Sequence, residues 1–296
     1  MEIKELKFPT LSLDDPDLWK ESKYKGEVVK LQYHTHWYSG ASATPFKKPI
    51  CIYVPYGYNP LQDYNVVVLL PGMDMPYSCY LSRAHRYSKE LYSVQFKNVL
   101  DNLIAAKVIE PCILVTMPYY GATVEGHPVM ELDANQIVRE VRNDLLPYII
   151  ENYRTYANGA DELSIQKARE HFGIFGFSYT STMILKYIMP KCIDLFSWFG
   201  ASSVFHSDLK EAVQPLWWAI THDYPLDYLY VGCGDSDNAY DQTLEMYNTF
   251  CSLVPDINYK SSLVVLPKTG HDARTYDTAI INCLLKFFDK PKTESV

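Results

Sequence analysis

Short, unbroken runs of β-branched and aliphatic residues recur along the chain. A run of this kind is typical of a strand that is buried on both faces of a sheet. One earlier segment alternates between polar and apolar residues instead, as a half-buried strand does. Together these patterns predict eight strands, at residues 27–37, 49–55, 66–70, 112–117, 172–175, 195–199, 228–231 and 263–266.

From the third strand onward, apolar residues at helical spacing fill the stretches between the strands. The longest helix should begin at Asp133, where Gln136 completes a capping box, and should be kinked at Pro147. Another should end at Pro190, since proline cannot continue a helix without strain. The predicted helices cover residues 94–106, 133–153, 180–189, 240–253 and 276–288.

Two early strands precede any helix, and short strands then alternate with helices. This order favours a mostly parallel sheet that is covered by helices on both faces. An antiparallel start of this kind is typical of the α/β-hydrolase fold. We therefore predict an eight-stranded α/β-hydrolase, one catalytic domain over residues 1–296, and a flexible tail at about residues 290–296.

Composition excludes several classes of protein. Of the 296 residues, 48% are apolar and 21% are charged, and no apolar run reaches the roughly 18 residues that span a bilayer. These values exclude a membrane-spanning or disordered chain. The net charge is −8 and no basic cluster is present, which disfavours nucleic acid as a partner. The first residues lack the apolar segment of a signal peptide, so we expect none in this sequence.

One Gly-x-Ser triplet has the context of a nucleophile. Four such triplets occur, ending at Ser42, Ser178, Ser202 and Ser236. Only Ser178 has an apolar strand directly before it and an apolar helix directly after it, which is the layout of a nucleophile elbow. Ser42 falls in a predicted polar loop and Ser236 in a polar turn. The final glycine of the Gly-x-Ser-x-Gly motif is replaced by Thr180.

A serine nucleophile needs a histidine base and an acid that orients it, and in this fold they follow the serine in the order acid, then histidine. His271 lies after the last strand and before the last helix, where the base is expected. Asp235 and Asp237 both lie in the turn after the strand at 228–231. Either aspartate could accept a hydrogen bond from His271, and the other would form the turn.

The oxyanion hole should use two backbone N–H groups. One belongs to Tyr179, the residue after the nucleophile. The other should come from the loop after the strand at 66–70, where Gly72 allows close approach and Met73 is the expected donor.

These motifs resemble the feruloyl and acetyl-xylan esterases of the esterase D type, which are carbohydrate esterases related to the mycolyltransferase antigens. The matching segments are 52–58, 68–72, 147–154, 176–178 and 270–272. The resemblance implies Ser178 as nucleophile, His271 as base and Asp237 as acid. The sequence departs from the family pattern at Pro71, Tyr179 and Thr180, where histidine, methionine and glycine are usual.

The resemblance also implies a serine carboxylesterase that releases ferulic or related hydroxycinnamic acids from plant cell-wall arabinoxylan through an acyl-enzyme. Such a substrate implies secretion. The partner would be a small-molecule or polysaccharide-linked ester, with no cofactor. Aromatic side chains expected near the acyl group are Tyr77, Tyr119, Tyr120, Phe205, Trp217 and Trp218. The long loop expected at residues 202–226 could form a lid or acyl pocket.

Two alternatives remain open from the sequence. The same fold could hydrolyse acetyl-xylan or another small-acyl ester or thioester, or Thr180 could mark a hydrolase fold that only binds. His34 and His36 share one face of a strand and could bind zinc, but no third ligand is indicated nearby, so no metal is expected.

Overall fold

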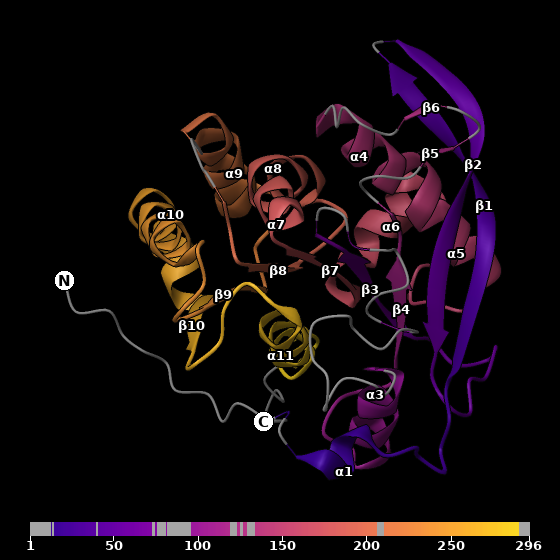
Figure 1. Cartoon of the computed structure of the whole chain (residues 1–296). Coiled ribbons are helices and arrows are strands. Elements are labelled where there is room, and N and C mark those ends of the chain that lie inside the picture. Colours follow the sequence, from indigo (N-terminus) through magenta and orange to yellow (C-terminus); the bar gives the residue numbers. More distant parts are fainter. Residues whose placement is uncertain are drawn as a thin grey trace, which may run out of the picture.

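An eight-stranded sheet with the order β1-β2-β4-β3-β7-β8-β9-β10 forms the centre of the molecule (Figure 1). The computed structural model describes residues 13, 15–39, 41–72, 75, 81, 96–118, 123–124, 127–128, 134–205 and 210–289. The predicted tail at 290–296 lies outside these residues. The chain has the α/β-hydrolase fold, which confirms the predicted fold class, while the extent of the domain over residues 1–296 stays a prediction.

The strands are antiparallel only at the start of the sheet. β1 pairs with β2 and β2 with β4 in antiparallel fashion, and every later pairing, from β4 with β3 to β9 with β10, is parallel. The carboxyl ends of the parallel strands therefore share one edge, where α/β proteins place their sites. The strands are β1 (Glu27–Ser39), β2 (Ser42–Val54), β3 (Asn65–Leu70), β4 (Cys112–Thr116), β7 (Phe172–Phe177), β8 (Trp198–Ser202), β9 (Tyr228–Gly234) and β10 (Ser261–Leu266), with a separate pair β5 (Thr123–Val124) and β6 (His127–Pro128).

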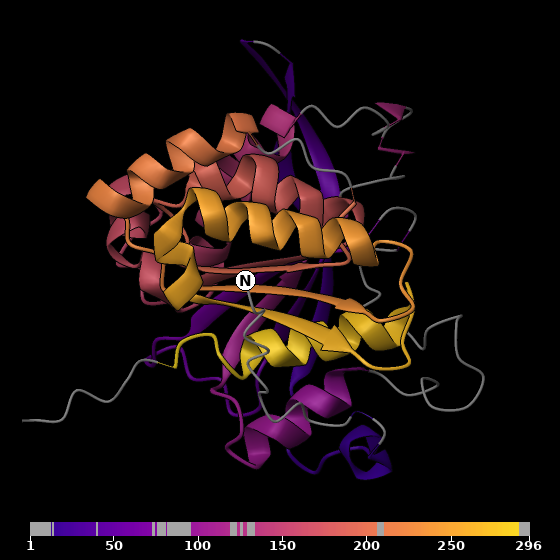
Figure 2. The same cartoon turned by 90° about the vertical axis from the view of Figure 1, so that its left-hand side faces the viewer.

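Helices cover both faces of the sheet (Figure 2). On β3, Val66 and Val68 face the core beneath α4, α5 and α7–α10, whereas Val67 and Leu69 face the core beneath α1, α3 and α11. No helix in the described ranges is long and apolar enough to cross a membrane. The α-helices are α1 (Pro16–Trp19), α3 (Phe96–Ala105), α4 (Ala134–Glu140), α5 (Leu146–Asn152), α6 (Glu162–Lys167), α7 (Tyr179–Met183), α8 (Met189–Cys192), α9 (Lys210–His222), α10 (Tyr240–Leu253) and α11 (Ala273–Leu284). Two π-helical turns are η1 (Val141–Leu145) and η3 (Ile184–Ile188), and two 3₁₀ turns are η2 (Arg169–His171) and η4 (Pro255–Tyr259).

Two strands begin three or more residues away from their predicted first residue, and the other predicted bounds differ by three residues or fewer. β2 begins at Ser42 rather than at residue 49, because its polar first half pairs with β1 in a long exposed hairpin. β8 begins at Trp198 rather than at residue 195, because the N–H groups of Leu195 and Phe196 both donate to the carbonyl of Cys192 in a turn after α8. Apolar residues in that turn are buried without being in a strand.

The predicted long loop at residues 202–226 contains helix α9, so the loop prediction was wrong for most of its length. Val213, Leu216 and Ile220 are buried at helical spacing, and this was the signal that could have revealed the helix. Pro215 obscured it, because proline inside a helix usually interrupts the backbone hydrogen bonding.

Pro147, which was predicted to kink a helix, and Pro190, which was predicted to end one, both follow π-helical turns. η1 precedes Pro147 in α5, and η3 precedes Pro190 in α8, so helical structure continues to Cys192. A π turn widens the backbone spiral and can accommodate a residue that lacks an N–H group. The expected capping box was also wrong at Gln136, whose side chain binds the backbone of His36 and Tyr38 in β1. Its expected partner Asp133 lies outside the described residues.

A buried carboxyl group on α11 leads to a prediction about stability and pH. Asp277 is 1% exposed, its Oδ1 has no hydrogen-bond partner among the described residues, and burial and nearby Asp272 raise its pKa well above the usual value. The folded chain therefore keeps this proton after the unfolded chain has lost it, above about pH 3.9. Stability should fall as pH rises through that window, by up to about 1.4 kcal/mol per pH unit.

Asp277→Asn removes this titration. We expect the variant to gain stability over the wild type as pH rises from 4 to 7.5, measured as the difference in urea midpoint at each pH. Asp256→Asn, which changes an exposed carboxylate, is the matched control and should show no such trend. A pH-independent difference for Asp277→Asn would show that the buried group is ionised in the folded chain.

Candidate active site

The turn between β7 and α7 holds Ser178 in a conformation that few residues adopt. Its φ is 60° and its ψ is −127°, and a non-glycine residue keeps a positive φ only where the surrounding structure enforces it. A Cβ atom added at Gly176 would lie 2.7 Å from the carbonyl oxygen of Thr180, so only glycine fits there. The elbow predicted at this position is present and tight.

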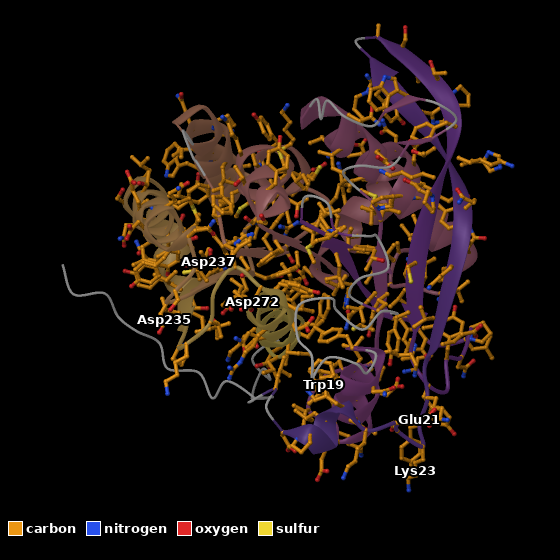
Figure 3. All side chains as sticks on the ribbon, viewed as in Figure 1. Trp19, Glu21, Lys23, Asp235, Asp237 and Asp272 are labelled. Atoms are coloured by element: carbon orange, nitrogen blue, oxygen red, sulfur yellow. The ribbon has the colours of Figure 1, made fainter. Side chains whose placement is uncertain are left out.

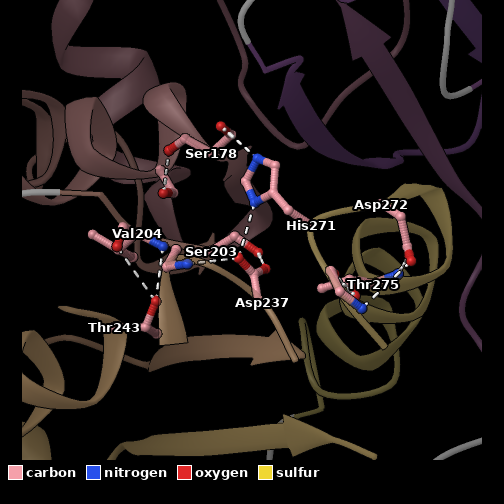
Figure 4. Close-up of polar contacts among 11 residues, drawn as sticks. Ser178, Ser203, Val204, Asp237, Thr243, His271, Asp272 and Thr275 are labelled. Atoms are coloured by element: carbon pink, nitrogen blue, oxygen red, sulfur yellow. Dashed lines mark hydrogen bonds and ion pairs between the residues drawn. The ribbon is translucent and has the colours of Figure 1, made fainter. Parts of the chain in front are cut away.

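The three residues predicted to form a catalytic set are brought together at the carboxyl ends of the strands (Figure 4). His271 Nε2 lies 2.9 Å from Ser178 Oγ, and His271 Nδ1 lies 3.1 Å from Asp237 Oδ1. With Nδ1 donating to the carboxylate, Nε2 is the nitrogen that accepts the serine proton. The imidazole can therefore take a proton from Ser178 while its other side is held by an anion.

Asp237 is held by donors on both oxygens. Ser203 Oγ donates to Oδ2 at 2.5 Å, and the N–H of Ala239 and His271 Nδ1 donate to Oδ1 at 2.8 and 3.1 Å. Burial alone would raise the pKa of this carboxyl, but the hydrogen bonds from His271, Ser203 and Ala239 outweigh burial and lower it. Asp237 is thus kept anionic although it is only 5% exposed.

Asp235 stabilises the turn after β9. It is exposed, its carboxylate accepts from Ser236 Oγ, and backbone hydrogen bonds, chiefly that from Lys268, lower its pKa. Figure 3 labels both aspartates on the chain after β9. Of the two alternatives that the sequence left open, only Asp237 contacts His271 in the described structure.

The loop that carries His271 is fixed against the turn that carries Asp237. The N–H of Ser236 donates to the carbonyl of Thr269 at 3.0 Å, and a Cβ atom at Gly234 would lie 2.1 Å from that same oxygen. After the histidine, Asp272 caps α11 by accepting the N–H of Thr275. The imidazole is therefore positioned from both sides of its loop.

Two aromatic rings flank the His271 imidazole. Phe177 stacks on it with a centroid distance of 4.8 Å, and Phe205 meets it edge-on at 5.0 Å. Phe205, half-buried, gives an apolar surface beside the reacting groups. Trp217 and Trp218 lie on α9 with 40% and 56% exposure, and their described ring contacts are with each other and with His222. Tyr77, Tyr119 and Tyr120 lie outside the described residues.

The turn after β3 that begins with Pro71 and Gly72, which was predicted to hold an oxyanion donor and is called the oxyanion turn below, lies close to Ser178. A Cβ atom at Gly72 would lie 3.2 Å from Ser178 Cβ, so a residue with a side chain would crowd the serine at this position. Met73, the expected donor, lies outside the described residues. Tyr179 is the first residue of α7 and places its N–H in the turn beside Ser178.

Ser203 was missed by the sequence analysis. It follows β8 with a φ of 57°, is fully buried, and its N–H donates to the carbonyl of Gly232 at 2.8 Å. Nothing in the local sequence marks it, because its partner Asp237 is 34 residues away.

On β1, His36 Nδ1 pairs with Asp144, and no cluster of three metal-ligating side chains occurs within the described ranges.

The fold and this set of residues define a hydrolase, and comparison with known proteins gives its family. The chain belongs to the esterase family described as "Putative esterase", whose model matches residues 41–253. This membership agrees with the resemblance found in the sequence.

Several known proteins are similar to this chain in sequence or in fold. Endo-1,4-beta-xylanase Y of Acetivibrio thermocellus is 28% identical over 174 residues, which are 59% of this chain and 14% of that much longer protein. The feruloyl esterase module from Clostridium thermocellum, in complex with sinapinate, superposes with a TM-score of 0.72 at 22% identity over 92% of both chains. A ferulic acid esterase from Anaeromyces mucronatus, in complex with ferulic acid, gives 0.63 at 18% identity over 93% and 95% of the two chains. The S-formylglutathione hydrolase of Staphylococcus aureus gives 0.57 at 13% over 90% and 98%.

Proposed function

We propose that this protein is a serine carboxylesterase that releases hydroxycinnamic acids from feruloylated xylan. The observation that carries the proposal is the series of two hydrogen bonds that connects Ser178 to His271 and His271 to Asp237, with Ser178 held in a tight elbow. The group attacked would be the ester carbonyl, since the family consists of esterases.

In the acylation step, Ser178 Oγ attacks the carbonyl carbon and its proton passes to His271 Nε2. The N–H groups of Tyr179 and Met73 would stabilise the negative oxygen of the tetrahedral intermediate. The intermediate collapses when the sugar oxygen leaves with the proton from Nε2. Water then attacks the acyl-enzyme with His271 as base, and the acid departs as Ser178 regains its proton.

The aromatic acyl group is supported by the relatives and by Phe205. Two of the structural neighbours hold sinapinate or ferulic acid, and one relative, endo-1,4-beta-xylanase Y, is named as a xylanase. Phe205 supplies an apolar ring next to His271, against which a phenolic ring could pack. A small-acyl preference is the competing candidate, because an S-formylglutathione hydrolase shares the fold.

An acyl panel separates the two candidates. We expect methyl ferulate to be hydrolysed with a higher kcat/KM than methyl acetate. Phe205→Ala should lower kcat/KM for methyl ferulate by about 10-fold, the order of one lost aromatic contact, and should change that for methyl acetate little. Equal loss for both esters, or preference for acetate, would favour the small-acyl function. The variants Trp217→Ala and Trp218→Ala test the predicted substrate contact of these two side chains. Unchanged kcat/KM on methyl ferulate and on feruloylated xylan would contradict that contact.

A further inference from the structure

Thr180 occupies the position where the elbow motif has its second glycine, and its hydroxyl is fully buried. Thr180 Oγ1 accepts the N–H of Phe177 at 3.0 Å. It also lies 2.9 Å from the carbonyl oxygens of Leu70 and Phe177, so its one proton can be donated to either. The hydroxyl thus joins the nucleophile elbow to the end of β3.

That junction lies where the sheet itself stops connecting the two segments. The pairing of β3 with β7 ends at Leu70 and Gly176. Beyond these residues the segment after β7 enters the elbow, and the segment after β3 enters the oxyanion turn. The bond from Thr180 to the Leu70 carbonyl therefore adds one link at the point where the ladder ends. It acts on the residue that leads into Pro71 and Gly72.

Small movements of this turn matter because it lies so close to the nucleophile. The Cβ position at Gly72 is 3.2 Å from both Ser178 Cβ and Phe177 Cδ1. An oxyanion donor acts over about 2.7–3.1 Å, and loss of one costs about 10²- to 10³-fold in kcat. A turn that moves away from Ser178 would weaken this interaction without removing any catalytic group.

The missing glycine leaves the elbow undamaged. Close approach inside the elbow is provided at Gly176, where a Cβ atom would lie 2.7 Å from the Thr180 carbonyl, while the side chain of Thr180 fits in the core. We propose that Thr180 is a positioning residue whose hydroxyl holds the oxyanion turn against Ser178, so that glycine at this position is the poorer choice in this chain. This assignment rests on the proposed esterase function.

The test compares Thr180→Val, Thr180→Gly and Thr180→Ser with the wild type on methyl ferulate, with active sites counted by fluorophosphonate labelling. Valine keeps the shape and removes the hydroxyl, glycine restores the motif, and serine keeps the hydroxyl. We expect kcat per active site to fall about 10-fold for valine and glycine, with KM changed less than about 2-fold, and serine to stay within about 3-fold of wild type. Inhibition by a phenylboronic acid, which forms a tetrahedral adduct, should weaken in parallel with kcat.

Thr35→Val is the matched control. It removes another buried threonine hydroxyl. Thr35 lies on β1, the edge strand of the sheet, and its hydroxyl donates to Asp144 at 2.8 Å. Thr35→Val should lower the denaturation midpoint and leave kcat per active site unchanged. If Thr180 only stabilised the fold, Thr180→Val would likewise lower the denaturation midpoint and leave kcat per active site unchanged.

Wild-type kcat and boronate affinity in Thr180→Val, or wild-type or better activity in Thr180→Gly, would overturn the assignment. If the valine variant does not fold, the glycine and serine variants decide it alone. Failure of the wild type to turn over esters and to be labelled would count against the proposed function and this assignment together. If all three variants turn over methyl ferulate as fast as the wild type, the result would count only against the role assigned to Thr180.

Discussion

Ser178→Ala is expected to lower kcat for methyl ferulate by about 10⁴-fold or more and to abolish labelling by a fluorophosphonate probe. The change removes the only oxygen that lies 2.9 Å from His271 Nε2 in the described structure, so no acyl-enzyme can form. Losses of this size follow removal of the serine from such a catalytic set, because its members act as a unit. Initial rates with purified enzyme and mass spectrometry of the probe adduct provide the measurement.

Ser236→Ala is the matched control for this variant. Ser236 also ends a Gly-x-Ser triplet, but it lies exposed in the turn after β9 and donates to Asp235. Its loss should leave kcat within about 2-fold, since an exposed neutral substitution removes no catalytic group. Full esterase activity in Ser178→Ala would reject the nucleophile and, with it, the mechanism proposed for this site.

Asp237→Asn should lower kcat by about 10³- to 10⁴-fold at neutral pH. The amide that replaces the carboxylate has no negative charge, so it no longer stabilises the imidazolium that forms when Nε2 takes the proton of Ser178. Its oxygen can still accept from the N–H of Ala239, and its NH2 group can donate to Ser203 Oγ. Because Asn and Asp have nearly the same shape, the loss should come without a large change in the unfolding midpoint.

Asp235→Asn distinguishes the two acids of the same turn. It removes an exposed charge that contacts Ser236 and the backbone of the His271 loop, and kcat should stay within about 2-fold. Measuring kcat and the urea midpoint of both variants separates chemistry from stability. Large loss in Asp235→Asn with normal activity in Asp237→Asn would reverse the assignment of the acid.

Local patterns predicted most of the fold because they report burial and backbone geometry within a few residues. The apolar runs located eight strands, and the strand–Gly-x-Ser–helix pattern singled out Ser178 from four similar triplets. The same reasoning failed where a local signal was ambiguous. Pro215 conceals α9, and the apolar residues Leu195 and Phe196 have the pattern of a buried strand although they lie in a turn.

By itself, therefore, the sequence determined the α/β-hydrolase fold, the elbow at Ser178 and the position of His271 between the last strand and the last helix. Each of these depends on the order and periodicity of neighbouring residues. The residue pattern left Asp235 and Asp237 open, and the family resemblance implied Asp237. Only the tertiary structure decided which of the two contacts His271, that Ser203 binds Asp237, and that Thr180 bonds the end of β3. These contacts join residues 34 to 110 positions apart, and their geometry depends on how the carboxyl ends of five parallel strands, β3, β7, β8, β9 and β10, meet at one edge of the sheet.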